Sequence, residues 1–290
     1  MKDSARHTYA RKGQDVVDKN IKAIETGASG IVEVTVDPAW ADLQFDKSVK
    51  GTTGDAFYDE YVTPINHLQG QDMPVSSFLN FGVTDGTLNP NVAFKEKRTI
   101  ATLVPEWEAD KCIQCGKCGF ACPHATIRSF LMDEEEVATA QKIAAENNVE
   151  LTLKDPSPAY KGAKEANLKF RIQVSTRSCV GCGVCITVCP TKALSAADVK
   201  TQLGQEPVAD YLYKHTTYKK EFGNNNTEGG ISLMMPYFEV SGCCPGCGEA
   251  PYYRLASQLF GNDMLVANAT GCSMIYCSAT PTNPFVQDEN

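Results

Sequence analysis

The spacing of apolar residues predicts several secondary-structure elements in the first third of the chain. Val17, Ile21 and Ile24 share one face of a helix expected over 8–27, with Gly27 as its stop. The stretch IVEVTV (31–36) alternates apolar and polar residues, which predicts a strand. From about 50 to 105 the sequence is rich in Gly, Pro and Thr, and we expect irregular structure there.

The pattern changes between 133 and 174. A helix is expected from Asp133, because Glu136 three residues later completes a capping box. The stretches 149–153 (VELTL) and 168–174 (LKFRIQV) have period two and predict strands. Together they predict a self-contained insert at 133–174.

The last third predicts the beginning of an α/β domain. GNNNTEGG (223–230) is typical of a flexible linker. A helix over 251–260 begins with Pro and ends at Gly261. We expect a short buried strand at 264–268 (MLVAN), followed by a tight turn at 269–273.

Composition narrows the functional classes. The net charge is −8, which argues against binding to a nucleic-acid backbone. No apolar run approaches the roughly 18 residues of a membrane span, and the first residues do not resemble a signal peptide. The 13 cysteines therefore predict metal or redox chemistry in a reducing compartment, the cytoplasm, rather than a disulfide framework.

Eight of these cysteines occur in two runs with the same spacing. CIQCGKCGFACP begins at Cys112 and CVGCGVCITVCP begins at Cys179, and both follow the pattern C-x₂-C-x₂-C-x₃-C-P. In this pattern three cysteines wrap one [4Fe–4S] cluster, and the fourth reaches a second cluster. We therefore assign cluster A to Cys112, Cys115, Cys118 and Cys189, and cluster B to Cys179, Cys182, Cys185 and Cys122. The alternative is a non-redox zinc-binding interaction module, but zinc pairs C-x₂-C units and would leave the third cysteine of each run over.

A third group of cysteines lies near the end of the sequence. Cys244 and Cys247 form a C-x₂-C pair, and Cys272 follows 25 residues later. Three ligands fit either a zinc site or an incomplete cluster, and the residues alone do not decide between the two.

Several short stretches resemble the pyruvate:ferredoxin (flavodoxin) oxidoreductases, in order and along nearly the whole chain. They are DMPVSSF (72–78), DGT (85–87), EKRTIATLVPEW (96–107), the first cysteine run, CCPGCGEAPY (243–252), QLFGNDM (258–264) and NATGCS (268–273). The resemblance implies an enzyme that converts pyruvate and CoA to acetyl-CoA and CO₂. Electrons from a thiamine-bound radical would pass through three [4Fe–4S] clusters to an external ferredoxin or flavodoxin. A related enzyme acting on another 2-oxo acid is equally compatible.

The same resemblance implies a role for residues near the end of the chain. Cys244, Cys247 and Cys272 match three of the four ligands of the third cluster. Glu249 and the turn Thr270, Gly271, Cys272 and Ser273 match positions that contact thiamine diphosphate, which binds with Mg²⁺ in the full-length enzyme. Without the resemblance, Glu249 is typical of an acidic residue at a helix N-terminus. Cys243 and Cys277 depart from the family pattern and are expected to be spectators.

The resemblance also implies an α+β multidomain fold. Residues 1–50 would end a preceding domain, and 51–105 would form an irregular domain named after Glu96-Lys97-Arg98. A bacterial-type 2[4Fe–4S] ferredoxin-like domain would follow at 106–205, with its insert at 133–174. Residues 206–290 would form a linker and the first, incomplete part of a thiamine-diphosphate domain.

We therefore expect a fragment or split subunit that is inactive alone. The remaining domains of the oxidoreductase and a second copy of it would be its partners, without nucleic acid or membrane. Glu96, Lys97 and Arg98 are expected to have a structural role within their own domain.

Overall fold

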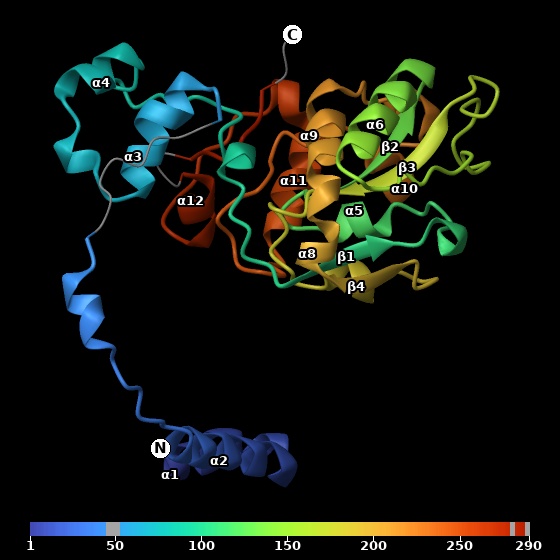
Figure 1. Ribbon diagram of the computed structural model, residues 1–290. Helices are drawn as coiled ribbons and strands as arrows, with labels where there is room; N and C mark the ends of the chain where they lie inside the picture. The colour runs from blue at the N-terminus through green and yellow to red at the C-terminus, as the bar shows by residue number, and fades with distance from the viewer. Residues whose placement is uncertain (45–52, 279–281, 288–290) are drawn as a thin grey trace. The chain divides into compact units, whose positions relative to one another are not determined.

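A computed structural model describes residues 1–44, 53–278 and 282–287 (Figure 1). The chain divides into two compact units, Met1–Ser48 and Val49–Asn290.

The first unit contains two helices. α1 (Lys2–Tyr9) and α2 (Gln14–Ser29) pack against each other, and Lys2 Nζ forms an ion pair with Glu25 at 2.8 Å. The helix expected over 8–27 is therefore interrupted before Gly13, whose φ of 99° is one that residues other than glycine rarely adopt.

The strand predicted at 31–36 is wrong. These residues form no ladder, and Ile31 is 82% exposed. Alternation predicts which side chains share a face, but a strand also needs a neighbour for its backbone hydrogen bonds, and none is present among the described residues of this unit.

The second unit begins with short helices around an aromatic cluster. α3 (Thr63–Asn66) and α4 (Val75–Asn80) flank a π-helical turn at Tyr58–Val62. Phe57 stacks on Tyr61 with ring centroids 5.2 Å apart, and Phe78 and Phe81 meet these rings edge-on or tilted. Burial of this cluster gives an otherwise irregular segment a core of its own.

A duplicated frame forms the centre of the second unit. Its first half is β1 (Leu103–Trp107), α5 (Lys117–Ala121) and β2 (Ile127–Met132), and its second half is β3 (Lys169–Val174), α7 (Val184–Thr187) and β4 (Leu194–Asp198). The halves exchange strands, because β1 pairs with β4 and β2 with β3, both antiparallel. Each cysteine run is thus held between a strand of one sheet and a strand of the other.

The insert at 133–174 contains two of its three predicted elements, the helix from Asp133 and the strand at 168–174, which is β3. α6 (Glu134–Glu146) begins with the expected capping box at Asp133 and packs against α9 (Glu206–His215). The strand predicted at 149–153 is wrong, since pairing there is limited to a single bridge between Lys154 and Phe170. The insert is not self-contained, because its last strand, β3, pairs with β2 outside it.

The segment after β4 is mostly helical. α8 (Val199–Gln202), α9 and α10 (Glu228–Ile231) are followed by α11 (Ala250–Phe260) and α12 (Cys272–Cys277). α11 matches the predicted helix. Residues 264–268 do not form the predicted strand: Leu265 is 100% exposed, and the described residues beyond Asp198 contain no sheet to shelter it.

The linker predicted at 223–230 is wrong as well. Gly230 is buried, and a Cβ at Gly116 would lie 2.6 Å from the Cα of Gly229. Residues 228–229 therefore pack directly on the first cysteine loop, and glycine at 116 is what permits this close approach.

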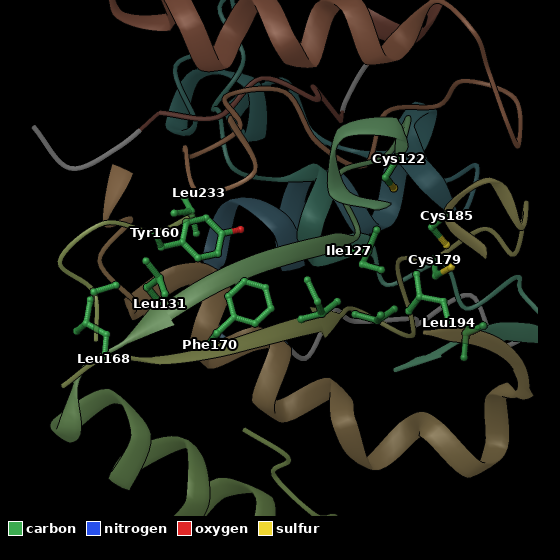
Figure 2. Packing of buried hydrophobic residues seen from close by; sticks show 14 of the residues in the cluster. Cys122, Ile127, Leu131, Tyr160, Leu168, Phe170, Cys179, Cys185, Leu194 and Leu233 are labelled. Carbon is green, nitrogen blue, oxygen red and sulfur yellow. The ribbon is translucent and has the colours of Figure 1, made fainter. Parts of the chain in front are cut away.

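The main core lies between the two β-pairs. Phe170 is fully buried and stacks on Tyr160 at 5.7 Å between ring centroids. Figure 2 shows Leu131, Leu168 and Phe170 at one end of this core and the sulfurs of Cys122, Cys179 and Cys185 at the other. One apolar core thus supports both the strands and the cysteine loops.

Candidate metal centre

Four cysteines from both runs line one pocket. Cys112, Cys115, Cys118 and Cys189 face it together with Trp107 and Ile172. The first three come from the loop before and within α5, and Cys189 comes from the turn after α7. All four are partly buried.

The other four cysteines line a second pocket of about 200 Å³. Cys179, Cys182 and Cys185 come from the second loop and α7, and Cys122 follows α5. Figure 2 shows Cys179 and Cys185 beside each other with Cys122 nearby. This pocket is deeper than the first, because all its cysteines except Cys182 are buried.

Both loops repeat the same backbone conformation. Left-handed residues occur at matching positions: φ is 58° at Gln114 and 69° at Gly181, and 74° at Gly116 and 73° at Gly183. The turns direct backbone N–H groups at sulfur, so that Gln114 N and Gly181 N each lie 3.4 Å from the Sγ two residues earlier. Ala193 N likewise donates to Cys189 Sγ at 3.2 Å. Such donors stabilise negative charge on sulfur.

The thiols influence one another within these groups. Burial raises the pKa of Cys118 to about 12, and Cys112, Cys115 and Cys189 add to the effect. Burial also raises the pKa of Cys179 to about 12, with Cys122 and Cys182 as further causes. Four converging cysteines are a donor set suited to a cationic metal centre, which replaces the protons of the thiols.

The described residues contain no compact group of side chains that could hold a single metal ion. Within residues 1–44, 53–278 and 282–287, no three Cys, His, Asp or Glu side chains lie close enough to hold one ion. A zinc site requires four donors about 2.3 Å from one centre. Each pocket is instead lined by four cysteines, three from one run and one from the other, which is the ligand pattern of a pair of four-iron clusters.

The third group of cysteines is more open. Cys244 and Cys272 are exposed and Cys247 is partly buried. Gly246, with φ of 74°, lies between the pair, and a Cβ there would come 3.8 Å from Cys182 Cβ and 3.6 Å from Val184. The turn of Cys244 and Cys247 therefore packs against the loop that lines the second pocket.

Glu249 and the two extra cysteines lie nearby. Glu249 immediately precedes α11, and its carboxylate adds to the effect of burial in raising the pKa of the Tyr276 phenol. Cys277 is buried. Cys243 is also buried, and its sulfur accepts a hydrogen bond from Ser241 Oγ at 3.2 Å and lies 3.6 Å from His124 Nε2. Thr270 and Gly271 form the turn that precedes Cys272 and Ser273 at the start of α12.

Side chains outside the cysteine runs hold the first loop. Lys154 Nζ donates to the carbonyls of Ala109 and Cys112, each at 2.8 Å, and Tyr160 donates to the carbonyl of Gln114 at 2.9 Å. The Gln114 side chain in turn binds the backbone of Asp155 and Ser157. These residues carry no signal in the sequence, because no motif marks a lysine that binds carbonyls 42 and 45 positions away.

A buried arginine also contacts the backbone between a cysteine of the first pocket and a cysteine of the second. Arg254 of α11 donates to the carbonyl of Phe120, which lies between Cys118 and Cys122.

No helix among the described residues is long and apolar enough to cross a membrane.

Comparison with known proteins gives two consistent results. Residues 111–193 match the family described as "4Fe-4S dicluster domain". The chain is 38% identical over 291 residues to "Pyruvate-flavodoxin oxidoreductase" of Enterobacter agglomerans and 36% identical over 287 residues to "Pyruvate:ferredoxin oxidoreductase" of Moorella thermoacetica. It is 33% identical to "Pyruvate dehydrogenase [NADP(+)], mitochondrial" of Euglena gracilis. Each alignment covers 98% of this chain, which spans 23%, 23% and 15% of these relatives.

Proposed function

We propose that this chain, which belongs to the pyruvate:ferredoxin and pyruvate–flavodoxin oxidoreductase family, is the electron-transfer segment of such an enzyme. The observation that carries the proposal is the division of eight cysteines into two four-thiol pockets, each with three cysteines from one run and one from the other. The dicluster match supports two iron–sulfur clusters in the same residues. The reaction of pyruvate and CoA to acetyl-CoA and CO₂ is proposed from the relatives.

The proposed ligands of each cluster are the four cysteines that line one pocket. Cys112, Cys115, Cys118 and Cys189 would hold cluster A, and Cys122, Cys179, Cys182 and Cys185 would hold cluster B. A [4Fe–4S] cluster supplies a centre that takes up and releases one electron. The chain contributes the thiolates, the N–H donors of residues 114, 181 and 193, and the apolar walls that keep water away from sulfur.

The third cysteine group is proposed as the entry point for electrons. Cys244, Cys247 and Cys272 would hold three corners of a third [4Fe–4S] cluster. Glu249 and Thr270–Ser273 would contact thiamine diphosphate. The close approach of Gly246 to Cys182 supports an order in which cluster B is the neighbour of this entry site.

Cluster A is proposed as the exit. Its four cysteines are all partly exposed, whereas three of the four around cluster B are buried. An external ferredoxin or flavodoxin would approach the surface beside Cys112 and Cys115. A cytoplasmic location and a homodimeric enzyme are proposed from the family, and the mitochondrial relative from Euglena gracilis marks the alternative compartment.

Anaerobic reconstitution tests the assignment. The chain should take up about eight irons with equal sulfide from clusters A and B, because the third cysteine group offers only three of the four thiolates that a cluster requires. It should also gain broad absorption near roughly 400 nm that bleaches on reduction. Colourless protein that binds zinc with no iron would refute the proposal and support a zinc-binding interaction module.

A further inference from the structure

The tripeptide Glu96-Lys97-Arg98 connects two loops that lie far apart in the sequence. Lys97 adopts φ of 44° and Thr99 φ of 52°, so the backbone turns sharply at this point. Lys97 Nζ donates to Glu206 Oε1 at 2.7 Å and to Asp210 Oδ1 at 2.6 Å, both on α9. It also lies 3.3 Å from the centroid of the Phe94 ring.

Hydrogen bonds connect the Lys97–Glu206 ion pair to the second cysteine loop. The Glu206 carboxylate accepts hydrogen bonds from Ser175 Oγ at 2.8 Å and from Thr176 Oγ1 and Arg177 N, both at 3.0 Å. Cys179 N in turn donates to the carbonyl of Ser175 at 3.0 Å. Lys97 thus neutralises the buried carboxylate that shapes the backbone immediately before Cys179.

Arg98 reaches the third cysteine loop instead. Its two Nη atoms donate to the carbonyls of Ser241 and Val240, each at 3.1 Å, while its Nε binds Glu96 at 2.6 Å. Val240 N donates to the carbonyl of His124 at 2.9 Å, which fixes the same segment to the residue two positions after Cys122. Residues 240–241 lead directly into Cys243 and Cys244.

These contacts correct the expected role of the tripeptide. The side chains of Lys97 and Glu206 are only 19% and 5% exposed, so water weakens this pair much less than a surface pair. Both cations bind partners outside residues 51–105, so their role extends beyond that segment.

We propose that Glu96-Lys97-Arg98 is a positioning element that fixes the separation between the loop of Cys179 and the loop of Cys244 and Cys247. This inference rests on the proposed function, in which electrons cross the gap between these loops. Electron transfer between two centres slows steeply with their separation, so a small displacement of either loop reduces the rate without removing a ligand. The tripeptide would therefore act on the rate of electron transfer and not on cluster binding.

Hydrogen exchange on the full chain tests the connection. In Arg98→Gln, exchange over 240–247 should become about tenfold faster, as the loss of charge-assisted hydrogen bonds predicts. In Lys97→Met the same acceleration should appear at 175–179, and Lys97→Arg should restore most of the protection. Iron content should stay at the parental value in all three.

Lys95→Met provides the matched control. It removes a neighbouring cation whose partner is Asp55, which belongs to neither cysteine loop, and both segments should exchange at the parental rate. Unchanged exchange at 240–247 in Arg98→Gln would overturn the proposal.

Stopped-flow reduction of the complete oxidoreductase, in which this segment is joined to the remaining domains, completes the test. In Arg98→Gln, cluster reduction by pyruvate should slow about tenfold or more, whereas reduction by dithionite should keep its rate. Faster exchange combined with an unchanged pyruvate-driven rate would also overturn the positioning role. If pyruvate fails to reduce the clusters of the parental enzyme, the proposed function fails, and the exchange result alone then decides whether the tripeptide holds both loops.

Discussion

At the scale of single residues, sequence spacing predicted how the eight cysteines of the two runs are grouped. The spacing of each run indicated that the fourth cysteine leaves its own loop, and the structure brings Cys122 and Cys189 into the pockets of the opposite runs. Spacing could not predict how buried each thiol is, since burial depends on residues such as Tyr160 and Phe170 that come from elsewhere in the chain. The ligand roles themselves stay predictions.

Substitution of one exchanged cysteine tests these roles. Cys122→Ser should lower iron from about eight to about four per chain, with loss of the cluster held by Cys179, Cys182 and Cys185. Iron analysis and electron paramagnetic resonance of the reduced protein measure this. Cys277→Ser is the control, and it should keep the full iron content. Selective loss of the cluster held by Cys112, Cys115 and Cys118 would contradict the assignment.

A buried ion pair beside the pockets gives a second prediction at this scale. Arg128 pairs with Glu239 and donates to Tyr218 Oη at 2.8 Å, and both charged side chains are almost fully buried. Arg128→Met should cost about 3–5 kcal/mol in the free energy of unfolding, because it leaves a buried carboxylate without its cation. The double variant with Glu239→Leu should recover much of that loss in urea titrations. Equal stability of the single and the double variant would show that the unpaired Glu239 carboxylate does not cause the loss of stability.

At the scale of elements, local signals worked where the determinants are local. The capping box at Asp133 and the Pro and Gly around 251–261 predicted α6 and α11, because caps and helix propensity act within a few residues. The strands failed where a partner was needed. Residues 31–36 and 149–153 alternate as strands do but form no ladder, whereas β1 was missed because LVPEW follows an irregular segment and contains Pro105.

The cap of α6 predicts a pH-dependent stability. Hydrogen bonding to Glu136 N lowers the pKa of Asp133, with Lys219 as a further cause, while burial opposes the shift. A carboxylate with a lowered pKa stabilises the fold above its unfolded value and loses that contribution as pH falls through about 4 and below. Asp133→Ala should cost about 1 kcal/mol at pH 7, and this cost should shrink as pH falls below about 4. A cost that is constant across this range, measured by urea titration, would show that the charge is not responsible.

The insert gives the second prediction at this scale. Replacing 133–174 with a Gly/Ser linker should remove most of the bound iron, because β3 would be lost from its pairing with β2 and Lys154 from the carbonyls of the first loop. Iron analysis after reconstitution measures this. A replacement confined to the exposed residues 164–167 is the matched control and should keep the iron. Full iron content in the large replacement would instead show that the insert is self-contained and is not needed to position the cysteines.

At the scale of the whole molecule, metal binding and folding are coupled. Each pocket takes three cysteines from one half of the duplicated frame and one from the other, so a bound cluster crosslinks β1–α5–β2 to β3–α7–β4. Clusters bind the folded chain and stabilise it by mass action. Removal of iron by an anaerobic chelator should therefore lower the melting temperature of the entire frame in one transition. Loss of iron with an unchanged melting temperature would show that the apolar core alone holds the halves together.

The two halves of this frame share one turn conformation, but the residues at that turn contact different neighbours. At 114 the left-handed position carries a glutamine, whose amide binds residues 155 and 157, while at 181 it carries a glycine, where a Cβ would come 2.9 Å from the carbonyl of Leu103. Exchanging these two residues would disrupt the packing of both halves, although the two turns have the same backbone conformation. If the frame arose by duplication of one ancestral segment, its two ends have since diverged, with one pocket buried and the other near solvent. If the pockets hold the proposed clusters, this asymmetry would make one of them suited to serve as an inlet for electrons and the other as an outlet.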